Sequence, residues 1–377
     1  MAGLYLHIPF CKSRCIYCAF YSTTGLELRQ RYIDALCREM EIREPSPIST
    51  IYLGGGTPSQ LTIDQLRQLF IYINKVYAPP LYLEGDGGRL EITIEVNPDD
   101  VTEVFAEGLK SLPVNRVSMG AQTFNDERLR FLRRRHTASQ VTEAVRRLRD
   151  AGIHNISVDL MYGFPNETIS DWQHDIDAAL ALDAEHLSAY CLMVEKGTAL
   201  YYQMRNEKLG MRNEEKEEKE RAMYELLIDK LTSAGYEHYE ISNFAKPGHR
   251  SRHNSSYWHD VPYIGLGAAA HSYDGKCRQW NVADISQYMD AIERGEILCE
   301  QEYLDDDTRY NDRITVALRT SDGLDLTTLS AKHRSYCMNE ARRFLDDGLL
   351  RLQDNHLVLT RKGLFVSDYV MSALVIV

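Results

Sequence analysis

Strand-like and helix-like segments alternate through the first half of this 377-residue chain. Each strand-like run is short and apolar, and each following segment repeats its apolar residues every three or four positions, as in an amphipathic helix. Repeated strand–helix units form a parallel sheet with right-handed connections. The pattern therefore predicts the α/β class, as a doubly wound sheet or a barrel, and six units fit an incomplete, TIM-like (β/α)6 barrel.

The expected strands are apolar and β-rich, which is typical of parallel strands that are buried on both faces. They are Leu4–Ile8, Thr50–Leu53, Glu91–Val96, Arg116–Met119, Ile156–Leu160 and His186–Leu192. The expected helices are Leu26–Arg43, Ile63–Val76, Val101–Leu112, Ala138–Ala151 and Ile169–Leu182.

Polar or glycine-rich segments stand where these strands end. In chain order they are the cysteines after Ile8, Gly54–Gly56, Glu95, Gln122, Asp159 and Tyr190. Ligands of parallel sheets and barrels gather at the carboxyl ends of the strands. One site assembled from six separate segments is therefore expected there.

Three cysteines, Cys11, Cys15 and Cys18, form the most specific motif, C-x-x-x-C-x-x-C, directly after the first strand. Three thiolates can hold three irons of a [4Fe–4S] cluster and leave the fourth iron open to a small molecule. A structural zinc site with His7 as a further ligand, or inert buried thiols, are the alternatives. The other cysteines are scattered and read as ordinary reduced thiols: Cys37, Cys191, Cys277, Cys299 and Cys337.

The composition and charge of the chain argue against several classes of protein. The net charge of −12 argues against nucleic-acid binding, which needs a basic footprint. The first ten residues lack a secretory signal, and no apolar stretch approaches the roughly 20 residues of a membrane span. A cytoplasmic protein is expected.

The alternation stops near residue 195, which predicts three regions. Residues 1–195 would form the barrel, residues 196–300 an accessory α+β segment, and residues 301–377 a small helical, winged-helix-like unit. In the second region, Gly235–Ala245 reads as a strand and Pro247–Ser256 as a loop. In the third, a hairpin is expected around Asp354 and Asn355, and the apolar end Tyr369–Val377 is expected to dock as a helix or strand.

The motifs resemble those of the radical S-adenosylmethionine (SAM) superfamily, beginning with the three cysteines and the aromatic Tyr17 before the last of them. Further segments are similar to the oxygen-independent coproporphyrinogen III oxidases and their relatives, the HemW-type haem chaperones. These segments are Tyr5–Cys11, Gly54–Pro58, Glu95–Pro98, Ser118–Gln122 and Asp159–Gly163. The resemblance covers almost the whole chain.

The resemblance implies a radical SAM barrel in which the three cysteines ligate a [4Fe–4S] cluster and SAM chelates the open iron. Gly55, Gly56 and Thr57 would lie against the methionine part of SAM. The remaining implied SAM contacts are Tyr5, Tyr17, Glu95, Gln122, Arg134 and Asp159. Taken singly, the polar members of this set also have ordinary structural roles, and Arg134 could lie on a solvated helix face.

The sequence differs from the oxidase pattern in two features. The oxidase pattern carries a further cysteine where this chain has Phe20, and an amino-terminal extension where this chain has only four residues before Tyr5. Both put porphyrinogen decarboxylation in doubt and leave the question of enzymatic activity open.

A third feature favours the chaperones. The segment from His253 to Trp258 reads H-N-x-x-Y-W and looks like their haem-binding signature. His253 would be an axial ligand, Tyr257 and Trp258 would cover the macrocycle, and His271 is a nearby alternative ligand. The implied cargo is haem, and the implied partners are acceptor haemoproteins. Peripheral membrane contact, a cluster-linked homodimer and productive cleavage of SAM stay open.

Overall fold

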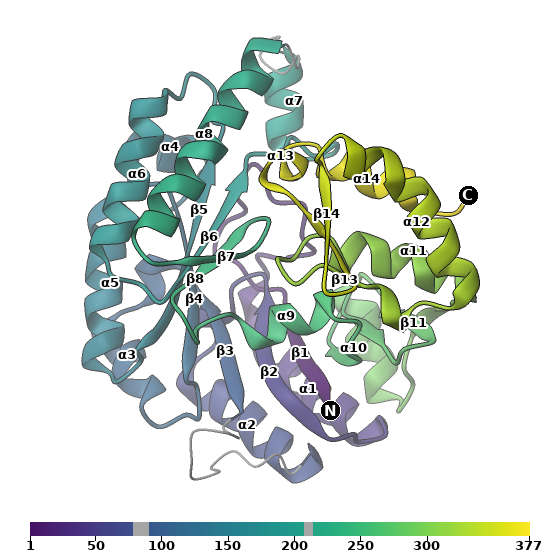
Figure 1. Ribbon diagram of the computed structural model, residues 1–377. Helices are drawn as coiled ribbons and strands as arrows, with labels where there is room; N and C mark the ends of the chain where they lie inside the picture. Colours follow the sequence, from purple (N-terminus) through teal and green to yellow (C-terminus); the bar gives the residue numbers. More distant parts are fainter. Residues whose placement is uncertain (78–89, 207–213) are drawn as a thin grey trace.

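Six parallel strands form the centre of the molecule and lie side by side in sequence order (Figure 1). The computed structural model describes residues 1–77, 90–206 and 214–377. All six predicted strands are present, and the predicted α/β fold with an incomplete (β/α)6 barrel is confirmed. The strands are β1 (Ala2–Ile8), β2 (Ile48–Gly55), β3 (Glu91–Val96), β4 (Arg116–Gln122), β5 (Asn155–Tyr162) and β6 (His186–Cys191).

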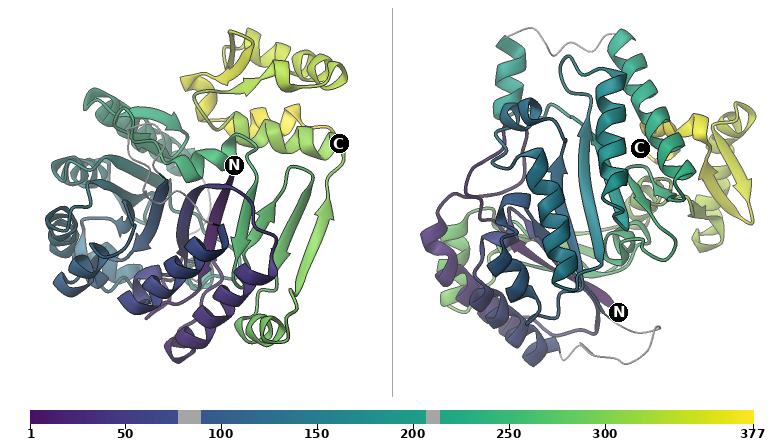
Figure 2. Two further views of the ribbon diagram at one scale, coloured as in Figure 1. Left: turned by 90° about the horizontal axis from the view of Figure 1, so that it is seen from below. Right: turned by 90° about the vertical axis from the view of Figure 1, so that its left-hand side faces the viewer.

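Helices cover the outer face of this sheet (Figure 2). Their apolar stripes pack on strand residues such as Leu53, Ile94 and Val158, none of which is exposed. Thr137 and Thr168 begin two of the helices through capping boxes, which satisfy free backbone donors at the first turn. The helices are α1 (Arg29–Ile42), α2 (Ile63–Tyr77), α3 (Glu103–Leu109), α4 (Asp126–Phe131), α5 (Ala138–Asp150), α6 (Ile169–Ala181), α7 (Ala199–Asn206) and α8 (Glu214–Ser233).

The strands are buried on both faces, as expected, but their inner face is polar. Successive side chains of a strand point to opposite faces, so apolar residues face the helices while their neighbours face the lumen. Thr93 and Ser157 are fully buried there, as is His186, whose Nδ1 lies 2.7 Å from Ser157 Oγ. The lumen, which is the space that the inner face of the strands encloses, is therefore lined by side chains that can donate or accept hydrogen bonds.

Further strands extend the same sheet on both sides. The predicted strand Gly235–Ala245 is a hairpin of β7 (Glu237–Glu240) and β8 (Asn243–Ala245) beside β6. On the other side, β9 (Tyr263–Leu266) runs parallel to β1, followed by antiparallel β10 (His271–Tyr273), β11 (Cys277–Asn281) and β12 (Cys299–Tyr303). The helix α10 (Ile285–Glu293) packs with α1 beneath them (Figure 2).

The prediction of a loop over Pro247–Ser256 is wrong for its second half, where the helix α9 (Arg252–Trp258) begins. Ser251 caps this helix, and the Glu91 carboxylate accepts hydrogen bonds from the backbone N–H groups of Arg252 and His253. A carboxylate at a helix amino terminus is favourable for the helix dipole. The helix thus depends on a contact with β3, which is distant in sequence.

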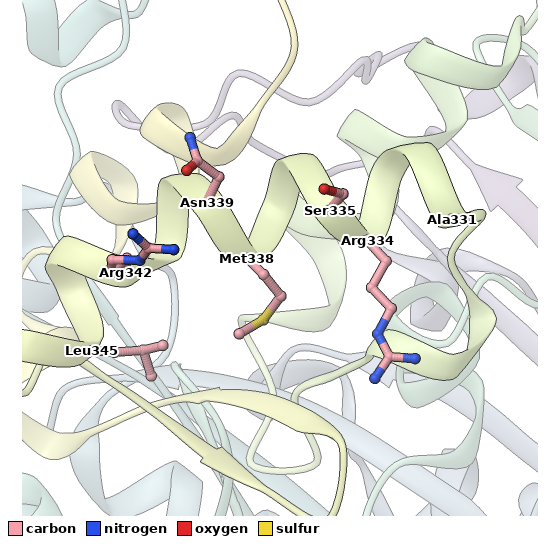
Figure 3. Close-up of a pocket in the computed structure, with 7 residues that line it drawn as sticks. All are labelled: Ala331, Arg334, Ser335, Met338, Asn339, Arg342 and Leu345. Carbon is pink, nitrogen blue, oxygen red and sulfur yellow. The ribbon is translucent and has the colours of Figure 1, made fainter.

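The last part of the chain has its own apolar core, with helices around a three-stranded antiparallel sheet. The predicted hairpin turns at Asp354 and Asn355, both with positive φ, and the apolar end docks as α14, as expected. A hollow of about 590 Å³ runs along α12 beside Arg334, Met338 and Arg342 (Figure 3). The elements are α11 (Asp306–Ala317), β13 (Leu324–Asp325), α12 (Ala331–Asp346), β14 (Leu350–Gln353), β15 (His356–Leu359), α13 (Arg361–Leu364) and α14 (Ser367–Leu374).

Within the described residues, no helix combines the length and the apolar character that crossing a membrane requires. The division of the chain near residues 195 and 300 stays a prediction, since one continuous sheet contains strands from both sides of residue 195.

Candidate functional site

The three cysteines lie on one loop that begins at the carboxyl end of β1. Backbone hydrogen bonds close the base of this loop, from Cys11 N to Thr23 O (2.9 Å) and from Thr23 N to Pro9 O (2.7 Å). The middle of the loop is held by Ile16, which bonds the backbone of Leu132 and Leu200. All three cysteines are free thiols and partly exposed.

Two of the thiols lie against polar side chains from other strand ends. Cys11 Sγ is 3.4 Å from Thr57 Oγ1, and Cys15 Sγ accepts a hydrogen bond from Arg134 Nη1 at 3.6 Å. Burial raises the pKa of the Cys11 and Cys18 thiols. An arginine next to a sulfur stabilises the thiolate form, which is the form that binds metal.

The donor set on this loop suits an iron–sulfur cluster better than a zinc ion. Cysteine thiolates are the usual ligands of a [4Fe–4S] cluster, which spreads them over separate irons. His7, the proposed fourth zinc ligand, has Nδ1 3.1 Å from Tyr5 OH and Nε2 3.0 Å from Tyr21 O, so both of its ring nitrogens are engaged.

Gly55 and Gly56, at the carboxyl end of β2, pack directly against the segment that leads into the cysteine loop. Gly56 N donates to Ile8 O at 2.9 Å, and a Cβ on Gly56 would lie only 2.6 Å from the carbonyl carbon of Pro9. Gly55 has a φ of 108°, which side chains disfavour. These two glycines, called the glycine ledge below, are required for this close approach.

Hydrogen bonds next to Cys15 join the cysteine loop to the ends of β3 and β4. Arg134 Nη2 donates to Asn97 Oδ1 (2.6 Å) and to Gly120 O (2.5 Å), and Tyr17 OH donates to Gln122 Oε1 (3.2 Å). Gln122 has a φ of 71° at an irregularity of β4. Backbone strain and bulges of this kind cluster at functional sites. The arginine is therefore not on a solvated helix face.

Deeper in the lumen lie two carboxylates, Glu95 and Asp159, whose pKa values the charge of the buried Arg116 lowers against the larger effect of burial. Glu95 accepts from Tyr52 OH (2.7 Å) and Gly55 N (3.1 Å), and burial raises its pKa to about 7. Asp159 accepts from Ser118 Oγ (3.3 Å), and burial raises the pKa of this carboxyl as well. Buried carboxylates of this kind suit a ligand that supplies hydroxyl donors.

Sequence reasoning missed two members of the site. Asn97 links Arg134 to Thr57 Oγ1, to which its Nδ2 donates at 3.3 Å. Tyr52 supports Glu95 and packs on Tyr5, with ring centroids 6.2 Å apart. The signals were present, since Asn97 directly follows β3 and Tyr52 precedes Gly54 on the same face of β2.

The structure does not place the residues proposed for haem beside the cysteines. His253 lies at the opposite, amino-terminal end of the barrel and is fully buried. Its Nδ1 is 2.8 Å from Thr50 Oγ1 and its Nε2 is 2.9 Å from Tyr257 OH, while burial lowers its pKa to about 3. The Trp258 ring packs under the Arg319 guanidinium at 5.1 Å.

Family models match two parts of the chain. The Radical SAM superfamily matches residues 5–179, and the HemN C-terminal domain matches residues 304–366. The cysteine loop and the strands β2–β5, with most of β1, lie in the first match, and β6 follows it.

Comparison with known proteins identifies the family. A protein named heme chaperone HemW from Bacillus subtilis (strain 168) is 35% identical over 99% of this chain and 99% of its own length. One of the same name from Mycobacterium tuberculosis (strain ATCC 25618 / H37Rv) is 32% identical over 99% of this chain and 94% of its own length. A similar solved structure is that of coproporphyrinogen III oxidase (HemN) from Escherichia coli, described as a radical SAM enzyme. The two structures superpose with a TM-score of 0.82 at 22% identity, over 99% of this chain and 89% of that chain. This similarity shows a shared fold. The chain belongs to the HemW family of the radical SAM superfamily.

Proposed function

We propose that this protein is a haem chaperone whose barrel carries a [4Fe–4S] cluster and binds SAM. Membership of the HemW family supports the cargo and the transfer of haem to acceptor haemoproteins. The observation that carries the SAM site is the hydrogen-bonded series of Cys15, Arg134, Asn97 and Thr57, which ties the cysteine loop to the ends of β2 and β3.

The cluster would be held by Cys11, Cys15 and Cys18. When bound, it would supply an electron donor and one iron that is open to the amino and carboxylate groups of SAM. Arg134 would stabilise the Cys15 thiolate by a charge-assisted hydrogen bond. The buried base of the loop, closed by Thr23, would keep water from that side of the site.

The ligand would lie between the glycine ledge and the lumen. Gly55, Gly56 and Thr57 would contact its methionine part, because bare backbone is the surface that they offer. Glu95 and Asp159 would accept hydrogen bonds from its ribose hydroxyls, which would offset part of the cost of burying the two carboxylates. The polar contacts would be completed by Gln122 and Arg134, with Tyr17 and Tyr5 at the borders of the pocket.

The chaperone role is favoured over porphyrinogen decarboxylation. Phe20 occupies the position of the further cysteine of the oxidase pattern, and its side chain is 71% exposed beside the loop. A phenyl ring cannot act as a thiol ligand. We therefore expect no loss of carboxylate from coproporphyrinogen III under anaerobic conditions with SAM and a reductant.

Anaerobic reconstitution with iron and sulfide tests the cluster. The wild-type protein should bind about four irons per chain and gain a broad visible absorption band. Cys15→Ser should lose the intact cluster, whereas Cys299→Ser, a partly exposed cysteine outside the loop, should retain it. Equal iron content in Cys15→Ser and wild type would refute the ligand assignment.

Haem transfer tests the function itself. The protein loaded with ferric haem is mixed with an apo-haemoprotein, and the Soret band of the acceptor is followed after separation of the two proteins. Transfer faster than that from free haem supports a chaperone. A protein that binds no haem, or that decarboxylates coproporphyrinogen III in the parallel incubation, would contradict it.

A further inference from the structure

A small polar hollow lies beside Cys15, where the cysteine loop meets the turn after β3 and the segment between α4 and α5. Its volume is about 10 Å³, which is room for one water molecule. Asp99 lines it from the turn after β3, and Arg134 and His136 line it from the segment between the helices. The hollow is thus next to the arginine that bonds the cysteine loop.

Three side chains that line this hollow each carry one buried polar atom that makes no hydrogen bond within the described residues. These atoms are Asp99 Oδ1, Arg134 Nε and His136 Nδ1. The great majority of buried polar atoms in folded proteins have a partner, and a buried atom without one is unfavourable. Three such atoms around one hollow indicate that they share a ligand.

The other polar atoms of these side chains fix what each of the three atoms can do. His136 Nε2 lies 3.0 Å from the carbonyl oxygen of Ala121 and therefore carries the ring proton, which leaves Nδ1 as an acceptor. Burial lowers the pKa of His136 to about 3, so the ring is uncharged near neutral pH. Asp99 Oδ2 pairs with Arg135 Nη1 at 2.8 Å, which leaves Oδ1 as a second acceptor. Arg134 Nε carries a hydrogen and can only donate.

One donor and two acceptors are the complement of a single water molecule. Water accepts the hydrogen of Arg134 Nε and donates its own two hydrogens to His136 and Asp99. A metal ion or an ammonium ion cannot accept that hydrogen, and an anion would face the Asp99 carboxylate. A ligand hydroxyl has one hydrogen and would leave one acceptor without a partner.

We propose that one bound water joins Arg134 Nε to His136 Nδ1 and Asp99 Oδ1, which makes His136 and Asp99 positioning residues for this arginine. The Nη1 and Nη2 atoms of the guanidinium already bond Cys15 and Asn97. The water holds its third nitrogen, so the guanidinium keeps one orientation at the cysteine loop. The inference rests on the proposed function, in which Arg134 supports the cluster and SAM.

A high-resolution crystal structure of the full-length protein tests the water directly. An ordered solvent peak within about 3.2 Å of all three atoms is the expected result. A structure without ordered solvent there would overturn the inference. So would an anomalous scattering peak from a metal ion at the same place.

Two substitutions of His136 separate its two nitrogens. His136→Gln can still donate to Ala121 O but has no acceptor in the place of Nδ1, so reconstituted protein should bind SAM about tenfold more weakly at unchanged iron content. His136→Asn offers an amide oxygen in the place of Nδ1 and gives up the bond to Ala121, so its SAM affinity should stay close to wild type. His154→Gln, at an exposed histidine before β5, is the matched control and should bind SAM as wild type does.

The outcomes distinguish this inference from the function on which it rests. Wild-type protein that binds SAM, with equal affinity in His136→Gln or with equal losses in His136→Gln and His136→Asn, would overturn the positioning role alone. Reconstituted wild-type protein that binds no SAM would overturn the proposed SAM site together with that role, and the crystal structure would still decide on the water.

Discussion

At the scale of single residues, the buried carboxylate of Glu95 lowers the stability of the fold but suits a ligand that donates hydroxyl groups. Burial raises its pKa from 4.5 to about 7, so the folded protein binds this proton more tightly than the unfolded chain does. Stability therefore falls as pH rises from about 4.5 to about 7, and the full cost persists above that window. A ligand that donates hydroxyls would compensate part of this cost.

Replacement of Glu95 by Gln should stabilise the ligand-free protein at pH 8. The expected gain in the free energy of unfolding is up to about 3 kcal/mol, since one pKa unit corresponds to about 1.4 kcal/mol. At the same time, SAM should bind more weakly. Thermal or urea unfolding at pH 5 and pH 8, with and without SAM, measures both effects.

Glu44→Gln is the control for this charge change, because Glu44 is exposed. It should alter neither the pH dependence of unfolding nor the affinity for SAM. A Glu95→Gln protein that is less stable than wild type at pH 8 would show that the carboxylate is a net stabilising group in the fold.

Arg134 acts through the shape of its side chain as well as its charge. Its guanidinium reaches Cys15, Asn97 and a backbone carbonyl together, which a lysine ammonium cannot do in the same geometry. Arg134→Lys should therefore keep its iron content but bind SAM about tenfold more weakly, as measured by equilibrium titration. The adjacent exposed Arg133, changed to Lys, should have wild-type affinity; equal losses in both variants would argue against a specific role of Arg134.

At the scale of elements, the contact between the glycine ledge and the cysteine loop is tight enough to be tested by one methyl group. Gly56→Ala would place a Cβ 2.6 Å from the Pro9 carbonyl carbon, so the loop must shift. Its iron content after reconstitution should fall although all three cysteines are intact. Gly152→Ala, at a positive φ of 84° with no atom within 4 Å, should lose some stability and no iron.

The junction of α9 with β2 depends on His253. His253→Ala removes two hydrogen bonds, leaves the Thr50 and Tyr257 hydroxyls without that partner and opens a cavity beside Tyr52. Losses of this kind amount to about 2–4 kcal/mol. Urea unfolding should show this decrease, whereas His154→Ala should lie within about 0.5 kcal/mol of wild type. An unchanged midpoint in His253→Ala would mean that the buried network contributes little.

At the scale of the whole molecule, the first half of the fold was predictable because each strand carries its own apolar run and each helix its own periodicity. The strands β9–β12 were not predicted, because they are short and few of their residues are fully buried, as Tyr303 illustrates with an exposed fraction of 75%. The helix α9 was missed because the Glu91 carboxylate that supports its first turn comes from a distant strand.

The site, like the fold, could be predicted from the sequence only in part. The rule that ligands gather at the carboxyl ends of strands grouped Gln122 with the cysteines, and the structure brings Gln122 and also Arg134, from the segment between α4 and α5, to the cysteine loop. The same rule could not identify Asn97 as a member of the site, because its role depends on a hydrogen bond to Arg134 that only the folded structure shows.

The most direct test of the account is the electron paramagnetic resonance spectrum of the reduced, reconstituted protein with and without SAM. An iron that no protein ligand occupies should bind SAM, so the signal should change on addition of SAM in wild type and change far less in Arg134→Lys at a limiting concentration. A spectrum that is identical with and without saturating SAM would mean that the metal centre has no open iron facing this pocket, and the proposed site would be wrong.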